Sequence, residues 1–226
     1  MIISGIVKSS FVDYPKNISA VIFTAGCNFD CFYCHNRHIL NQNKTSINEQ
    51  DVLSFLHERK KFLDAVVISG GEPTLQKDLV DFIKKVKEMG YKVKLDTNGS
   101  NYEVVEHLIK NNLVDYVAMD IKAPFEKYEK YSGFSNVENI KRTKDLLLQN
   151  TVDYEFRTTL APGLNKDDIL KILEQIKGAK VLYIQKCNPT NSLGETNPLT
   201  AREIKNCCKM SKNFVFDLFL RGFNDF

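Results

Sequence analysis

Several features that would place a chain in a special class are missing from this sequence. No apolar run approaches the roughly 18 residues of a membrane span, and the N-terminus lacks the basic start, apolar stretch and small-residue cleavage site of a signal peptide. Neither sign of charge dominates, since 31 Lys and Arg against 28 Asp and Glu leave a net charge of +3. We therefore expect a cytoplasmic protein that has neither a membrane nor a nucleic acid as its partner.

Two lysine-rich stretches are the best candidates for a basic patch. One is Arg59-Lys60-Lys61, and the other holds Lys84, Lys85, Lys87, Lys92 and Lys94. Most of these residues lie on expected helices whose other face is apolar. Solvated faces are therefore predicted for both stretches.

No linker rich in Pro, Gly or Ser divides the 226 residues, so we expect one domain that spans residues 1–226. Short apolar runs alternate with stretches of helical periodicity, which is the pattern of repeated βα units around a parallel sheet. The expected strands are 18–24, 64–69, 91–96, 114–119, 152–158 and 179–185. The expected helices are 48–62, 76–89, 102–112, 136–149, 165–177 and 200–211, and 2–8 and 213–220 are expected to be further extended segments.

Four of the expected helix starts carry the capping-box pattern, a hydroxyl residue followed three positions later by Glu. The pairs are Ser46 with Glu49, Ser100 with Glu103, Ser135 with Glu138, and Thr200 with Glu203. Six βα units are two fewer than those of the closed eight-stranded barrel. The pattern therefore predicts an α/β fold, an incomplete (βα)6 barrel that is laterally open. A doubly wound sheet with helices on both faces is the alternative.

Cysteine spacing is the strongest chemical signal. Cys27, Cys31 and Cys34 form a CxxxCxxC pattern after the first expected barrel strand. Three thiolates can fill three iron sites of a four-iron cluster and leave the fourth iron open. A zinc site completed by His35 or His38 is the alternative. The adjacent Cys207 and Cys208 lie on a helical stripe and are expected to pack in the core, whereas the role of Cys187 is left open.

Polar motifs follow the next four expected strands. They are Ser69-Gly70-Gly71-Glu72-Pro73, Asp96-Thr97-Asn98-Gly99, Met119-Asp120-Ile121-Lys122, and Arg157 with Pro162-Gly163. Barrels and open α/β sheets bind their ligands at the carboxyl ends of the strands, so we expect one site. There Glu72 can take the amino group of a zwitterionic ligand, Lys122 and Arg157 its carboxylate, and Gly70-Gly71 allows a close approach of the backbone.

The CxxxCxxC segment, with Tyr33 before the third cysteine, resembles the signature of radical S-adenosylmethionine (SAM) enzymes, and the resemblance runs over nearly the whole chain. It implies that Cys27, Cys31 and Cys34 bind a [4Fe-4S] cluster whose open iron is chelated by SAM. An electron from the cluster then cleaves SAM to a 5′-deoxyadenosyl radical. The resemblance also places Tyr33 next to the adenine, and it assigns no side chain a catalytic role of its own.

The remaining motifs extend this resemblance. The GGEP motif of Gly70, Gly71 and Glu72 resembles the one that holds the amino group of SAM. Asp120, Lys122 and Arg157 resemble SAM-contacting positions of glycyl-radical activases. In those activases the aspartate and threonine of the DTNG motif and the fourth-strand aspartate also hold a monovalent cation, a role implied here for Asp96, Thr97 and Asp120. Asn98 belongs to the same DTNG loop. The sixth strand lacks the usual histidine. Either Cys187 faces the site or Gln185 contacts the ribose, and Gln185 is the expected contact.

The opening Ser10-Phe11-Val12-Asp13-Tyr14-Pro15 most resembles the activating enzymes of anaerobic ribonucleoside-triphosphate reductase, with pyruvate formate-lyase activases as close relatives. Lys16 replaces the usual glycine. The resemblance implies a large glycyl-radical enzyme as partner and an electron donor such as flavodoxin or ferredoxin. Two alternatives stay open: a radical SAM enzyme that acts on a small molecule, similar to 7-carboxy-7-deazaguanine synthase, and a non-catalytic zinc-binding α/β module.

Overall fold

The computed structural model describes residues 1–40, 46–187 and 199–223. These residues form two compact units. The first comprises Met1–Asn28, Asn36–Ala118 and Thr151–Asp153, and the second comprises Phe29–His35, Met119–Asn150 and Tyr154–Phe226. None of the helices in the described residues is long and apolar enough to cross a membrane.

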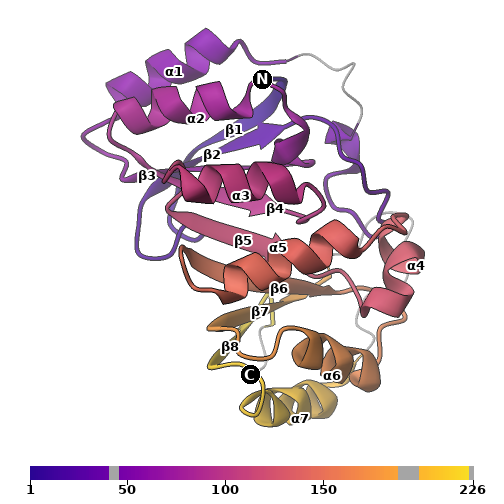
Figure 1. The fold of residues 1–226 in the computed structure, drawn as a ribbon. Helices are drawn as coiled ribbons and strands as arrows, with labels where there is room; N and C mark the ends of the chain where they lie inside the picture. The colour runs from indigo at the N-terminus through magenta and orange to yellow at the C-terminus, as the bar shows by residue number, and fades with distance from the viewer. Residues whose placement is uncertain (41–45, 188–198, 224–226) are drawn as a thin grey trace. The chain divides into compact units, whose positions relative to one another are not determined.

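The first unit begins with strand β1 (Ile3–Ser10), which pairs antiparallel with β2 (Ser19–Thr24). Parallel pairing then leads from β2 to β3 (Ala65–Gly70) and β4 (Lys92–Thr97). Its helices are η1 (Arg37–Ile39), α1 (Glu49–Glu58), η2 (Pro73–Leu75), α2 (Leu79–Glu88) and α3 (Tyr102–Lys110). Figure 1 shows α2 and α3 over the strands of this unit, against which α2 buries Leu79, Phe82, Ile83 and Val86.

The second unit holds β6 (Asp153–Leu160), β7 (Val181–Lys186) and β8 (Asp217–Arg221), which run parallel to one another. Its helices are η3 (Phe125–Lys127), α4 (Tyr128–Ser132), α5 (Glu138–Leu148), α6 (Lys166–Gln175) and α7 (Ala201–Ser211). Within this unit α6 and α7 pack against each other (Figure 1).

Strand β5 (Tyr116–Asp120) begins in the first unit and ends in the second. In each unit the strands follow one another in the order of the chain, without a reversal. A doubly wound sheet reverses its strand order at a switch point, so that alternative is wrong. The fold is α/β with an open, non-closed sheet, as the six βα repeats predicted.

The observed helix starts agree with the predicted capping boxes less well than the observed strands agree with the predicted strands. The capping box of Thr200 and Glu203 is present at α7. Helix α1 is instead capped by Asn48, whose side chain accepts from the amide of Gln50, and α3 and α5 have no side-chain cap. Helix α6 has a capping box of Asn165 and Asp168 that the hydroxyl pattern did not include. Amides and carboxylates serve as caps as well as hydroxyls do, so the predicted pattern was too narrow.

Candidate functional site

The segment between β2 and η1 carries the three clustered cysteines. Cys27 lies in the first unit and is half-buried, whereas Cys31 and Cys34 lie in the second unit, where Cys31 is buried. Burial raises the pKa of the Cys31 thiol, and the positive charge of Lys122 acts in the opposite direction. Among residues 1–40, 46–187 and 199–223, no three His, Cys, Asp or Glu side chains are grouped so that they could hold a metal ion.

Within the second unit, the start of the cysteine segment is anchored on helix α4 and the residues after it. The ring of Phe29 lies 6.2 Å from that of Tyr128 and 4.8 Å from that of Phe134. The amide of Asp30 donates to the carbonyl of Ser132 at 2.8 Å. This support was not predicted, because in the sequence only the aromatic character of Phe29 pointed to it.

In the first unit, two glycines at the end of β3, Gly70 and Gly71, lie against the chain's own backbone. Gly70 has φ of +118°, and a Cβ atom there would lie 2.4 Å from the amide nitrogen of Thr24. A Cβ atom on Gly71 would lie 1.9 Å from the carbonyl oxygen of Gly26. The two glycines were predicted to let a ligand approach the backbone closely. In the structure it is the segment leading to Cys27 that approaches them closely.

Glu72 is the most enclosed of the predicted site residues, with none of its surface exposed. Its Oε1 accepts from the amide of Thr74 at 3.1 Å, from the Thr74 hydroxyl at 2.6 Å and from the Thr97 hydroxyl at 2.8 Å. Its Oε2 accepts from the amide of Asn98 at 2.7 Å. Burial raises the pKa of Glu72, and these hydrogen bonds oppose that shift. The carboxylate thus joins the loop after β3 to the loop after β4.

The loop after β4 also reaches the first cysteine. Asn98 donates from Nδ2 to Oδ1 of Asn28 at 2.9 Å, and the same nitrogen lies 3.9 Å from Sγ of Cys27. Asn28 in turn donates to the hydroxyl of Ser100 at 2.8 Å. Within the first unit, the structure therefore brings Glu72, Thr97, Asn98 and Cys27 together.

Asp96 lies near the end of β4, where it contacts Ser69 and Lys94 of the first unit. Its Oδ2 accepts from the hydroxyl of Ser69 at 3.0 Å, and its Oδ1 lies 3.2 Å from Nζ of Lys94. Lys94 is only 1% exposed, so the prediction of a solvated face is wrong for this lysine. The alternation along β4 places Lys94 on the same face as Asp96, and that was the available signal.

In the second unit, two cations flank one carboxylate. Nζ of Lys122 lies 2.9 Å from Oδ2 of Asp120, and Nε of Arg157 lies 2.8 Å from Oδ1. Burial alone would raise the pKa of Asp120, but Arg157 and Lys122 hold it well below its usual range. Burial would lower the pKa of Lys122, and Asp120 raises it well above its usual value. Two cations and one anion leave one excess positive charge, which suits a ligand carboxylate.

Two tyrosines lie near this group within the second unit. The hydroxyl of Tyr128 donates to the carbonyl of Asp120 at 3.3 Å and accepts from the amide of Lys122 at 3.2 Å. Tyr33 is buried, burial raises its pKa, and its hydroxyl has no hydrogen-bond partner among the residues that the structure describes. A buried hydroxyl without a partner is costly, so this one can accommodate a bound polar group.

Gln185 and the remaining cysteines also lie in the second unit. Gln185 is half-buried on β7, where it pairs with Thr159 on one side and Arg221 on the other. Cys187 and Cys207 are buried, Cys208 is half-buried, and burial raises the pKa of all three thiols. The expected core packing of Cys207 agrees with its burial.

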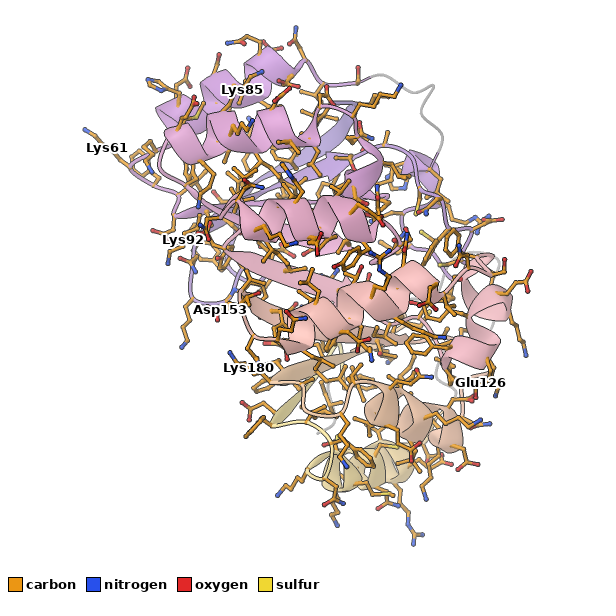
Figure 2. All side chains as sticks on the ribbon, in the orientation of Figure 1. Lys61, Lys85, Lys92, Glu126, Asp153 and Lys180 are labelled. Carbon is orange, nitrogen blue, oxygen red and sulfur yellow. The ribbon has the colours of Figure 1, made fainter. Side chains whose placement is uncertain are left out.

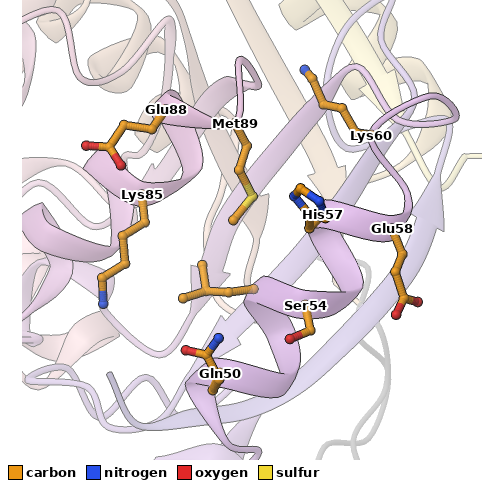
Figure 3. A pocket seen from close by; sticks show the side chains of 9 residues that line it. Gln50, Ser54, His57, Glu58, Lys60, Lys85, Glu88 and Met89 are labelled. Atoms are coloured by element: carbon orange, nitrogen blue, oxygen red, sulfur yellow. The ribbon is translucent and has the colours of Figure 1, made fainter.

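An open groove of about 810 Å³ lies between α1 and α2 in the first unit. Figure 3 shows its lining, which includes His57, Lys60, Lys85 and Met89. None of the predicted site residues lines this groove.

The three residues implied as ligands of a monovalent cation already have partners in the chain. Asp96 is paired with Lys94, and the Thr97 hydroxyl donates to Glu72. Both oxygens of Asp120 face cationic groups. A bound cation would have to displace these partners or share their oxygens.

Comparison with known proteins identifies the family. The model of the Radical SAM superfamily matches residues 21–176. The chain belongs to the Radical SAM superfamily, which argues against the non-catalytic zinc-binding module.

One relative matches along nearly its full length. It is a protein of Methanocaldococcus jannaschii, provisionally named a glycyl-radical enzyme activating enzyme, which is 38% identical over 99% of this chain and 97% of its own length. The structure is similar to SuiB of Streptococcus suis bound to S-adenosylmethionine, with a TM-score of 0.70, 14% identity, and coverage of 90% of this chain and 50% of that one. It is also similar to a domain of pyruvate-formate lyase-activating enzyme from Bacteroides vulgatus, with a TM-score of 0.55, 18% identity, and coverage of 70% of this chain and 99% of that one.

Proposed function

We propose that this protein is a radical SAM activase that abstracts a hydrogen atom from a glycine of a glycyl-radical enzyme, with anaerobic ribonucleoside-triphosphate reductase as the partner. The observation that carries the activase proposal is the full-length similarity to the M. jannaschii protein provisionally named an activating enzyme, since both chains are covered almost from end to end. The similarity to a probable GTP 3′,8-cyclase of Saccharolobus solfataricus covers only 48% of this chain.

Cys27, Cys31 and Cys34 are the proposed ligands of a [4Fe-4S] cluster. Their CxxxCxxC spacing and the membership of the chain in the superfamily support this assignment. Thiolate is the form that binds iron. Burial raises the pKa of the Cys31 thiol, and the charge of Lys122 opposes that shift only in part. When bound, the cluster and SAM supply a 5′-deoxyadenosyl radical through one-electron cleavage of the sulfonium. The chain must position the target hydrogen and exclude other reactants.

Lys122 and Arg157 are the proposed contacts of the SAM carboxylate, because they carry one positive charge more than Asp120 neutralises. Tyr33 and Gln185 are proposed for the adenosyl part, and the buried Tyr33 hydroxyl without a partner supports the first of these. Glu72 receives four hydrogen bonds from the chain itself. We therefore assign Glu72 to positioning the loops after β3 and β4 rather than to the amino group of SAM.

The test uses the reconstituted, reduced enzyme with SAM and purified anaerobic ribonucleotide reductase, and flavodoxin or ferredoxin as the proposed electron donor. The proposal expects a glycyl doublet in the electron-spin resonance spectrum of the reductase, together with 5′-deoxyadenosine. The Cys31→Ala variant should give neither product, and Cys208→Ala should give both. SAM cleavage stimulated only by a small metabolite, without a radical on a protein, would favour the small-molecule alternative.

A further inference from the structure

Lys94 is a buried cation for which the superfamily signature gives no role. It lies on β4, is 1% exposed, and donates from Nζ to the carbonyl of Asp13 at 2.6 Å. The same nitrogen lies 3.2 Å from Oδ1 of Asp96 and 5.6 Å from the ring centroid of Tyr116. Lysine is almost never fully buried unless its charge is paired, and here the pairing is with Asp96.

The position of the Lys94 ammonium matters for the loop after β3 because Asp96 also accepts a hydrogen bond from that end of the strand. The second oxygen of Asp96 accepts from the hydroxyl of Ser69 at 3.0 Å. Ser69 directly precedes Gly70 and Gly71, whose backbone packs against the segment leading to Cys27. All of these residues lie in the first unit. A chain of contacts therefore leads from the buried Lys94 on β4, through Asp96 and Ser69, to the glycines that pack against the segment before Cys27.

The surroundings of Nζ resemble those of a bound monovalent cation. A carbonyl oxygen and a carboxylate oxygen face it, and an aromatic ring lies nearby. Oxygen ligands of this kind also suit a potassium or sodium ion, and an ammonium group carries the same single charge. The two differ in one respect: the ammonium is tethered to the chain and is present at every salt concentration.

We propose that the Lys94 ammonium occupies, at Asp96, the place that a bound monovalent cation would otherwise take. The charge of Asp96 is then balanced from within the fold, and the loops after β3 and β4 keep their arrangement without an added ion. The consequence for SAM, which rests on the proposed function, is that its binding does not depend on which monovalent cation the buffer contains.

The test is a Lys94→Met variant, because Met keeps the length of the stem and removes only the ammonium. Thermal unfolding is measured in tetramethylammonium chloride and in potassium chloride of the same ionic strength. Removing the positive charge beside Asp96 should lower the Tm of the variant by roughly 10 °C in tetramethylammonium chloride. Potassium should recover about half of that loss or more, because an ion that binds only the folded state stabilises it by mass action. The wild type should unfold at the same temperature in both salts.

Lys92→Met is the matched control, because Lys92 lies on the same strand but is exposed (Figure 2). Lys92→Met should show neither the loss of Tm in tetramethylammonium chloride nor its recovery in potassium chloride. A Lys94→Met protein that potassium does not stabilise, or that folds in neither salt, overturns the proposal. So does a wild type that potassium stabilises as strongly as the variant. The double variant Lys94→Met/Asp96→Asn, which needs no balancing charge, should fold without a response to potassium; a potassium response equal to that of Lys94→Met would place the ion elsewhere.

This measurement requires neither cluster nor SAM, so its failure is distinguishable from a failure of the activase proposal. SAM affinity of the cluster-loaded protein then provides a second readout. The wild type should bind SAM equally well in both salts, whereas Lys94→Met should bind it more weakly in tetramethylammonium chloride than in potassium chloride. Equal affinities for the variant in the two salts would contradict the proposed link to SAM.

Discussion

Replacing Lys122 with Met removes one of the two cations that flank Asp120 in the second unit. Lys122 and Arg157 both contact this carboxylate, at 2.9 Å and 2.8 Å, and together the three groups carry one excess positive charge. Without Lys122 the charges of Arg157 and Asp120 cancel, so these two groups together no longer attract a ligand carboxylate. The Lys122 side chain is 18% exposed, so water screens it only in part. Truncating one partner of a desolvated charge contact costs about 2–5 kcal/mol, which corresponds to a SAM affinity lower by roughly 30-fold to several thousand-fold.

The assay is calorimetric titration of SAM into the cluster-loaded protein under anaerobic conditions. Lys130→Met is the control, because Lys130 is an exposed lysine of the same unit and should leave the affinity unchanged. Iron content and unfolding temperature show whether the variant still folds and holds its cluster. A folded, cluster-loaded Lys122→Met protein that binds SAM within about twofold of the wild type would refute the reasoning.

Three further predictions concern the cluster, the glycine loop and acid stability. Cys31→Ala should lose the iron that Cys208→Ala retains, as iron analysis after reconstitution will show; the opposite pattern would overturn the ligand assignment. Gly71→Ala should lower the free energy of unfolding by at least about 2 kcal/mol in urea titrations, because its Cβ would lie 1.9 Å from the carbonyl oxygen of Gly26. Gly5→Ala is the control, because its Cβ would meet only ordinary contacts, and it should lower the free energy of unfolding less. The pKa of Asp120 is lowered in the folded state, so its carboxylate adds stability above its ordinary pKa and loses that contribution below about pH 4. The stability advantage of wild type over Asp120→Asn should therefore be constant between about pH 5 and 8 and shrink in acid, and a change within that neutral window would be inconsistent with this assignment.

The strands were predictable from the sequence because apolar runs and turn residues mark them locally. The expected strand 64–69 is observed at Ala65–Gly70, and 91–96 at Lys92–Thr97. The motifs at the strand ends led us to propose Glu72, Asp96 and Asp120 as site residues, since ligands gather at the carboxyl ends of parallel strands.

The partners of these side chains were not predictable, because they depend on contacts between segments far apart in the chain. Thr97 and Asn98 donate hydrogen bonds to the two carboxylate oxygens of Glu72 and so join two loops. No local sequence pattern shows that the chain itself supplies these donors. Lys94 was expected in solvent because it was grouped with lysines of expected helices whose other face is apolar. It lies on the expected strand 91–96 instead, two residues before Asp96 and therefore on the same face. A short-range sequence pattern proposes which residues a site contains, whereas the tertiary fold decides which of these side chains already have partners in the chain.

The most direct test of the central claim follows the hydrogen atom itself. Anaerobic ribonucleotide reductase labelled with deuterium at the glycine α-carbon is incubated with the reduced enzyme and SAM, and the 5′-deoxyadenosine is analysed by mass spectrometry. The activase proposal predicts that deuterium from the protein appears in 5′-deoxyadenosine as the glycyl radical forms. Unlabelled 5′-deoxyadenosine from a fully labelled partner, with no glycyl radical, would contradict it.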